Sequence, residues 1–272
     1  MRGRAIFGFI SALLVAAILT GCAKVVKTAV ESTVTTAARR TGEVVGETLG
    51  EKIGRLIVRR YTPQFVTLYV SYILGYAFYS GDYWIETRGY EPGEWTRWVA
   101  LEEGAKGKTW IEKALLKRTE EGNEWWKVKF YDAQSGDTIV LEGLFSPNMG
   151  ELLRLRIKLP GKEPSELPVA KGMVYIPPIR LSKESIEGAT VGEETVVVPA
   201  GTFKTKHIRY ISPATGATME WFICDDVPGG VVKYLSRRAG AEKGEVEGLD
   251  RYNFAFELEA YGKGATSELG SF

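Results

Sequence analysis

From residue 90 onward, apolar and polar positions alternate with a period of two, and turn residues separate segments of strand length. Between Leu153 and Leu159, Leu or Ile alternates with Arg or Lys, which is typical of a strand with one dry and one wet face. We expect about ten strands, at 95–101, 109–117, 124–131, 137–145, 151–159, 194–198, 203–211, 218–224, 231–237 and 252–261. The short connections between them predict hairpins, and therefore an antiparallel sheet large enough to curl strongly or close.

The segment between the two groups of strands has a different character. Residues 160–178 are rich in Pro, which excludes a central strand there. We interpret the whole excursion at 160–192 as a candidate lid.

An uncharged apolar run at 64–80 follows Thr62 and Pro63, a good N-cap and first helical residue. Both a helical face and an alternating strand face can be drawn through it, but seventeen residues is long for a strand. We therefore predict a helix, apolar on nearly all sides and buried in the concavity of the sheet. A helix that dips into lipid stays an alternative. The expected fold class is mainly β (α+β), a half-barrel around this helix, preceded by a long N-terminal helix.

The first 21 residues have the parts of a secretory signal: Arg2 and Arg4, an uncharged apolar run at 5–19, and small residues before Cys22. The tetrapeptide LTGC at 19–22 resembles the lipobox of prokaryotic lipoproteins. The resemblance implies cleavage before Cys22 and acylation of its thiol, for example with palmitate. It places the chain in the cell envelope, lipid-anchored to the outer or cytoplasmic membrane, with its domain outside the cytoplasm. An uncleaved helix with a chance Cys is the alternative.

The segment 22–61 reads as a helical tether between the anchor and a folded domain at 62–272. A four-residue repeat aligns Gly42, Gly46, Gly50 and Gly54 on one helical stripe. Such a stripe indicates close approach of another backbone, and hence self-association as a homo-oligomer. A partly ordered spacer is the equally weighted alternative.

The segments VPAGTF at 198–203, MEWF at 219–222 and VPGGVVK at 227–233 resemble the closing hairpins of the LolA/LolB-like superfamily. The resemblance implies a half-barrel that carries lipid or lipoprotein against an internal helix. The same Pro and Gly residues are also what tight turns require. Unlike a freely diffusing carrier, this chain has its own lipobox and tether.

The composition of the chain restricts the kinds of ligand and site that we expect. With 35 Lys plus Arg against 34 Asp plus Glu, the net charge of +1 provides no footprint for nucleic acid. One His and two Cys leave few metal ligands and no recognisable catalytic set, so we predict no metal, no cofactor and no enzyme. His207 is expected at the surface of a strand, Cys224 as a small packed hydrophobe, and Asp225 and Asp226 in a turn. Scarce Gln, Asn and His are weakly typical of a thermophile's protein.

Seven Trp residues are the unusual feature of the composition. On a concave face they would line an apolar groove for acyl chains, although they serve equally as core around the helix. The ligand-binding candidates are Tyr72, Tyr76, Trp110, Trp126 and Trp221. Trp125 and Trp126 must point to opposite faces of their strand, and the sequence leaves open which one points inward.

These features favour a membrane-anchored binding module for an apolar ligand: a lipid, an acyl chain or a lipoprotein. The rival hypothesis is a structural or assembly lipoprotein that associates through the Gly repeat. Under that hypothesis, replacing Gly46 and Gly50 by Leu should abolish association.

Overall fold

The computed structural model describes residues 63–78, 83–101, 107–133, 135–169, 174–212, 216–237 and 254–272. All of them belong to Thr48–Phe272, one of the two units into which the chain divides. The signal, the lipobox with Cys22 and the tether with its four Gly residues lie outside the described residues.

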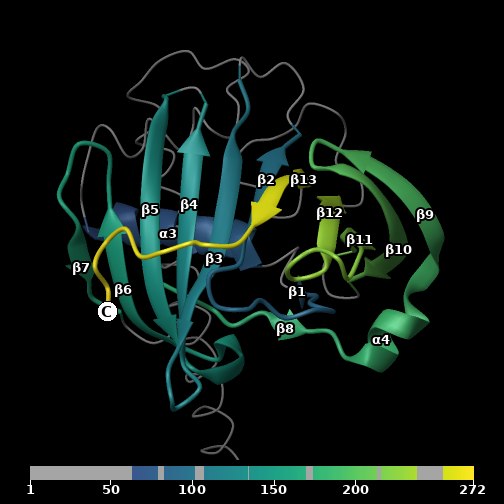
Figure 1. Ribbon diagram of the computed structural model, residues 1–272, viewed down its shortest axis with the longest axis horizontal. Helices are drawn as coiled ribbons and strands as arrows, with labels where there is room; N and C mark the ends of the chain where they lie inside the picture. The colour runs from purple at the N-terminus through teal and green to yellow at the C-terminus, as the bar shows by residue number, and fades with distance from the viewer. Residues whose placement is uncertain are drawn as a thin grey trace, which may run out of the picture. The chain divides into compact units, whose positions relative to one another are not determined.

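Eleven strands form one open antiparallel sheet in the order β7-β6-β5-β4-β3-β2-β13-β12-β11-β10-β9 (Figure 1). Their bounds are β2 (Trp95–Ala100), β3 (Trp110–Arg118), β4 (Glu124–Asp132), β5 (Asp137–Phe145), β6 (Leu152–Lys158), β7 (Ser165–Leu167), β9 (Thr190–Val198), β10 (Gly201–Ile211), β11 (Thr218–Ile223), β12 (Val231–Arg237) and β13 (Phe254–Gly262).

The sheet consists of two meanders, β2 to β7 and β9 to β13, which meet where the first strand of one pairs with the last strand of the other. In this pairing Trp95 lies opposite Gly262, and Ala100 lies opposite Phe256. The chain passes from one edge, β7, to the other, β9, through β8 (Ile179–Arg180) and α4 (Lys183–Gly188). On the way β8 pairs in parallel with β1 (Tyr83–Trp84).

The mainly-β class and the antiparallel sheet are confirmed. Each of the ten expected strands corresponds to an observed one, with bounds that differ by a few residues. The short strand β7 lies inside the Pro-rich interval, and it is an edge strand, where Pro nearby is tolerated. Strands β1 and β8, of two residues each, are too short to give a periodic signal.

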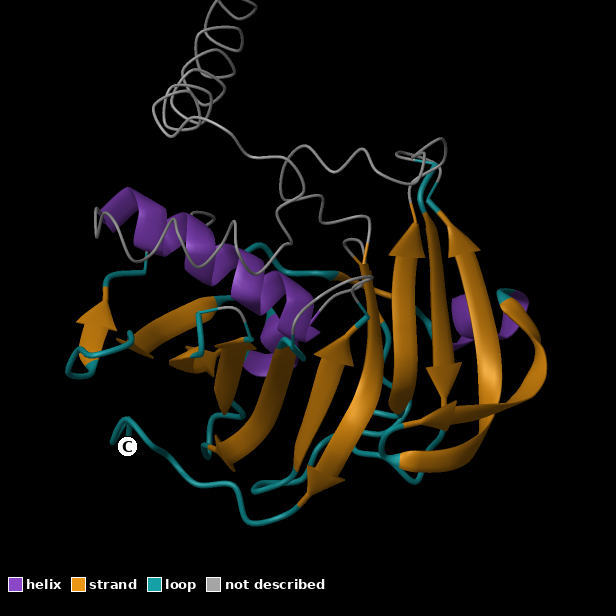
Figure 2. Ribbon diagram, turned by 90° about the horizontal axis from the view of Figure 1, so that it is seen from above, coloured by secondary structure: helices purple, strands orange, loops and turns teal. Residues whose placement is uncertain are grey.

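Helix α3 (Pro63–Phe78) corresponds to the helix expected over 64–80. We call the side of the sheet that it covers the inner face. Val70, Ile73 and Leu74 are at most 2% exposed and share one apolar cluster with inner-face residues such as Ile111 and Leu141. None of the helices in the described ranges is long and apolar enough to cross a bilayer. Figure 2 shows α3 and the C-terminal segment on opposite sides of the strands.

The opposite side of strands β4 to β7, the outer face, carries a row of charges of alternating sign. Lys127, Glu142, Arg156 and Glu166 lie directly opposite one another on successive strands. Opposite charges across neighbouring strands contribute roughly 0.2–1 kcal/mol per pair. The row offers polar partners to a segment that covers this face of the sheet.

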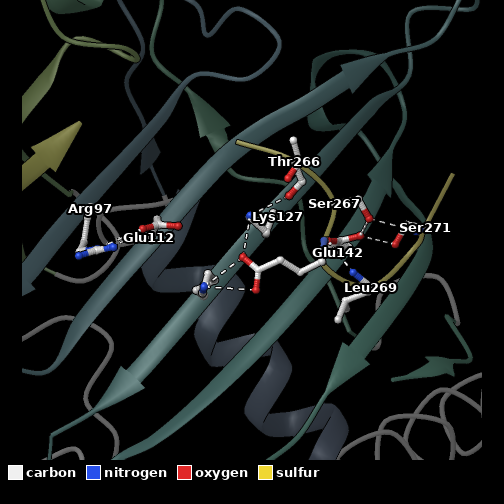
Figure 3. A network of polar contacts seen from close by, with 10 residues as sticks. Arg97, Glu112, Lys127, Glu142, Thr266, Ser267, Leu269 and Ser271 are labelled. Carbon is white, nitrogen blue, oxygen red and sulfur yellow. Dashed lines mark hydrogen bonds and ion pairs between the residues drawn. The ribbon is translucent and has the colours of Figure 1, made fainter. Parts of the chain in front are cut away.

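The C-terminal segment 263–272 runs across this row (Figure 3). Glu142, fully buried, accepts hydrogen bonds from the backbone N–H of Glu268 (2.6 Å) and Leu269 (3.2 Å), and from the hydroxyls of Ser267 (2.7 Å) and Ser271. A carboxylate with four donors is fully satisfied. Glu142 therefore fastens the end of the chain to the sheet.

Candidate functional site

Phe78, the last residue of α3, packs at the centre of an aromatic cluster on the inner face. Its ring centroid lies 5.4 Å from that of Trp126, 5.6 Å from that of Phe145 and 6.3 Å from that of Trp84. The pairs with Trp126 and Phe145 are edge-to-face, and such pairs contribute about 0.5–1.5 kcal/mol each beyond the burial of their area. The cluster therefore fixes the end of the helix against β4 and β5.

Lys113 brings a charge to this apolar face. It lies in β3 between Ile111 and Leu115, both fully buried, and strand alternation places all three side chains on the inner face. The Lys113 Nζ lies 5.1 Å from the ring centroid of Trp98 and 5.3 Å from those of Phe78 and Tyr90. Only 7% of the residue is exposed. Three rings from three segments thus enclose one amino group.

No hydrogen bond and no ion pair joins Lys113 to any residue in the part of the chain that the structure describes; its contacts there are with the three rings. Contact with a ring face is worth about 0.5–2 kcal/mol, whereas taking an ammonium group out of water costs several kcal/mol. Burial therefore lowers the pKa of Lys113 to about 8, against a smaller opposing effect of the Glu86 carboxylate.

Glu86, in the segment between β1 and β2, is the acidic counterpart of Lys113. Burial raises the pKa of the Glu86 carboxyl, and the positive charges of Lys113 and Arg180 act against that rise. Among the described contacts no ion pair joins Glu86 to Lys113, so the two side chains interact through space without a shared hydrogen bond.

One of the three rings carries a second donor without a partner among the described residues. The indole Nε1 of Trp98, a residue only 2% exposed, has no hydrogen-bond partner in the described part of the chain. The Trp98 ring also packs edge-to-face with Tyr234, at a centroid distance of 6.0 Å. Nζ and Nε1 can only donate, so a group that satisfies both must be an acceptor.

Four of the five predicted ligand residues lie in or beside the same apolar cluster. Tyr76, Trp126 and Trp221 are at most 4% exposed, and Tyr72 is half-buried at its margin. The Tyr76 ring packs 5.5 Å from Phe254, and its carbonyl accepts a hydrogen bond from the hydroxyl of Tyr234 (2.8 Å). These residues currently form packed core, which is the alternative that the sequence left open.

Trp110 needs a correction. Its neighbour Ile111 points to the inner face, so Trp110 points to the outer face. There it stacks on Tyr131 at 5.4 Å, with the guanidinium of Arg97 4.4 Å from its ring centroid. The expectation that Trp110 lines the concave face is therefore not supported, and we exclude it from the site.

The structure also settles the orientation of the adjacent Trp pair. Trp126 belongs to the inner-face cluster, and its Nε1 donates to Glu124 (2.9 Å). Trp125 belongs to a separate small cluster with Ala114 and lies 5.8 Å from the ring of Phe272. The C-terminal residue thus covers the outward-pointing Trp.

His207 is more buried than its expected place on a strand surface implies, with 9% of the residue exposed. Its Nε2 lies 2.7 Å from a Glu220 carboxylate oxygen on β11, and its ring stacks on Phe222 at 4.4 Å. The carboxylate that is missing from the neighbouring sequence comes from the neighbouring strand. Within the described ranges, no group of three or more His, Cys, Asp or Glu has an arrangement that could hold a metal ion.

The acidic pair at 225–226 lies in the turn between β11 and β12. Asp225 accepts a hydrogen bond from the Thr87 hydroxyl (2.7 Å), which ties the turn to the segment before β2. Burial, together with nearby Asp carboxylates, raises the pKa of the Cys224 thiol. A raised thiol pKa disfavours the nucleophilic thiolate.

The 160–192 excursion contributes to the core instead of standing free of it. Tyr175, 4% exposed, donates a hydrogen bond to the carbonyl of Met149 (2.9 Å), and Val174 is 2% exposed. Its middle is thus anchored, which restricts any lid motion to smaller parts of the excursion.

Sequence reasoning missed Lys113, although a signal for it exists. In the run Trp110 to Leu116, the period of two that predicts strand β3 puts a Lys at a position where only apolar residues are expected. Only the structure shows that Phe78, Tyr90 and Trp98 surround it.

No protein-family model matches the chain, and no curated protein matches it either. Among solved structures it is similar to a Bacteroides fragilis protein described as exported and as having a YmcC-like fold. The two chains are 13% identical, with a TM-score of 0.34; the match covers 66% of this chain and 100% of the other. A similarity of this extent leaves the function to be argued from the residues of this chain.

Proposed function

We propose that this protein is a lipid-anchored protein of the cell envelope whose folded domain binds an apolar ligand without catalysing a reaction. The location rests on the signal at 1–21 and on the lipobox that ends at Cys22. The ligand class, an acyl chain or the acyl part of a lipoprotein, follows from the inner face of the sheet.

One observation carries the proposal: an open sheet has an apolar inner face whose cover over β3 and β4 is the uncharged helix α3. In a closed barrel or a two-sheet sandwich, such a face would be covered by other strands, which backbone hydrogen bonds to their neighbours hold in place. Here apolar side chains of α3 supply much of the cover, and an acyl chain offers the same kind of surface.

The position of α3 fits a cover that can be exchanged. Leu68 is 46% exposed and Tyr72 half-buried, whereas Val70 and Leu74 on the other side of the helix are buried. The helix therefore has one side toward the sheet and one toward its surroundings. Ligand binding would replace contacts of the buried side, and the free energy of binding is the difference between the two sets of contacts.

The test uses the whole chain with Cys22→Ala, exported from an envelope-containing host, so that its own lipid anchor does not enter the measurement. Organic extracts of the purified protein are analysed by mass spectrometry. We expect about one lipid per chain, or uptake of one acyl chain on titration. A lipid-free protein that also takes up no acyl chain would overturn the proposal.

A matched pair of variants locates the binding surface. Tyr72→Ala removes an aromatic ring from the margin of the inner cluster, and we expect several-fold weaker uptake of a fluorescent acyl chain. Tyr261→Ala, at a 40% exposed position on β13, is the control and should leave uptake unchanged. Equal effects of the two would place the ligand elsewhere.

A further inference from the structure

We propose that Lys113 is the anchor for the head group of the ligand, and that the ligand is an acyl chain ending in an anionic group, a carboxylate or a phosphate. This inference rests on the proposed function and adds to it the chemical class of the ligand. It assigns to Lys113 the role of binding the anion through Nζ, with the Nε1–H of Trp98 as a second donor.

The first argument is the contrast between two buried lysines of the same sheet. Lys127, 5% exposed on the outer face, donates to the carbonyl of Thr266 (2.8 Å) and to the carboxylate of Glu268 (2.9 Å). Lys113, 7% exposed on the inner face, has neither kind of partner among the described residues. The fold supplies acceptors for one buried ammonium group and leaves the other with rings alone.

The second argument is the chemistry around Nζ. The rings of Phe78, Tyr90 and Trp98 favour a cation beside them, and the unpartnered Trp98 Nε1 belongs to one of these rings. An anionic head group offers acceptor oxygens to both kinds of donor. Hydrogen bonds between charged groups are roughly twice as strong as neutral ones, so an anion gains most from this enclosure.

The third argument is the surroundings of the enclosure. Around Lys113 the inner face is apolar: Ile111 and Leu115 flank it along β3, and Val128 lies opposite it on β4. Helix α3 carries no charged residue. A single cation among apolar side chains favours an amphiphile with an anionic end over a neutral lipid or a free anion.

The test compares dodecanoate with 1-dodecanol, which share a twelve-carbon chain and differ in the charge of the head group, on the full chain with Cys22→Ala. The affinity is measured by calorimetry and by quenching of Trp fluorescence. In Lys113→Met, which keeps the length of the side chain without its charge, we expect dodecanoate to bind ~10-fold or more weakly. Dodecanol should bind the variant at least as well as the parent chain.

Lys158→Met is the matched control, since it removes a lysine from an exposed position of the same sheet. It should change neither affinity. Near-ultraviolet circular dichroism checks that each variant keeps its aromatic packing.

Two further measurements keep the proposal testable if Lys113→Met fails to fold. Dodecanoate affinity of the parent chain should fall as the pH rises through the titration of Lys113, while dodecanol affinity stays flat. Glu86→Gln removes the carboxylate that acts on Lys113 and should tighten dodecanoate binding. The ionisable groups around Lys113 are Glu86 and the Tyr90 phenol. The inner positions of β4 add Glu124 and Asp132, and α3 adds the phenols of its tyrosines but no carboxylate and no amino group.

The outcomes separate the two proposals. If neither ligand binds the parent chain, the proposed function fails and the anchor with it. If both ligands bind with the same affinity and Lys113→Met weakens neither, the anchor is overturned while the apolar binding function stands.

Discussion

Glu142 and Lys113 show how differently two buried charges are treated at the scale of single residues. Glu142 receives four hydrogen bonds from the C-terminal segment, so its burial is structural. Lys113 has aromatic faces around it and no acceptor within the described residues. A satisfied charge stabilises one conformation, whereas an unsatisfied one lowers stability until a ligand completes it.

Glu142→Ala should release the end of the chain. The backbone donors of Glu268 and Leu269 lose their acceptor, and we expect the free energy of unfolding to fall by about 1–3 kcal/mol. Hydrogen exchange should show loss of protection at these two amides. Glu163→Ala, at an exposed loop position, is the control; equal protection in both variants would contradict the assignment.

Lys113 predicts a pH dependence of stability. Between pH 8 and 10.5, its folded and ordinary pKa values, the unfolded chain binds more protons at this residue than the folded one. The free energy of unfolding therefore rises with pH in this window, by about 1.4 kcal/mol per unit from this residue. Lys113→Met should be the more stable protein at pH 7, with an advantage that shrinks toward pH 10.5.

Urea denaturation of the parent chain and of Lys113→Met at pH 7, 8.5 and 10 measures this difference. Lys158→Met, tested in parallel, should show a difference from the parent that does not change with pH. A constant or growing advantage of Lys113→Met across the window would show that Lys113 keeps its ordinary titration.

At the scale of elements, the turns could be predicted from the sequence, but the residues that they contact could not. The Pro-Gly-Gly turn between β11 and β12 has φ of +78° at Gly229 and +80° at Gly230, as a tight turn requires. It also touches the segment before β2: a Cβ on Gly229 would lie 2.6 Å from Tyr90 Cε2. Because Tyr90 forms one wall around Lys113, this turn supports the enclosure.

A comparison of Gly229→Ala with Gly136→Ala separates the cost of the left-handed backbone from the cost of the contact with Tyr90. Gly136 also has a positive φ, +71°, but nothing lies within 4 Å of its added Cβ. The left-handed conformation costs each variant about 1–2 kcal/mol. We expect Gly229→Ala to lower the free energy of unfolding by more than that. It should also perturb the near-ultraviolet circular dichroism of the aromatic cluster. Equal losses in thermal denaturation would show that Tyr90 moves aside freely.

At the scale of the whole folded unit, β13 joins the two meanders, since it pairs with β12 on one side and with β2 on the other. The last strand in the sequence is therefore central in the sheet. The ten residues that follow it, 263–272, add no strand and lie over the outer face.

Two truncated chains test the different roles of β13 and of the segment 263–272. A chain that ends at residue 262 loses the acceptors of Lys127 but no strand, so it should fold with reduced stability. A chain that ends at residue 253 loses the strand between β2 and β12, and we expect no cooperative unfolding transition. Circular dichroism and limited proteolysis distinguish these results, and two equally stable truncated proteins would contradict the role of β13.

The sequence by itself determined the local elements of this protein. The positions of the ten strands, the helix at 63–78 and the turns with positive-φ Gly follow from side-chain period, Pro and Gly placement, and length, all of which act within a few residues. The antiparallel pairing of neighbours follows as well, because short connections leave little choice.

Only the tertiary structure decided which distant segments meet. The pairing of β2 with β13 joins segments far apart in the chain, and so do the rings around Lys113. The outward direction of Trp110 and the place of Glu220 beside His207 depend in turn on which face of each strand is covered. The physical reason is that a period of two defines two faces for each strand but does not say which face is covered or by what. That choice belongs to the packing of α3 on one side and of the C-terminal segment on the other.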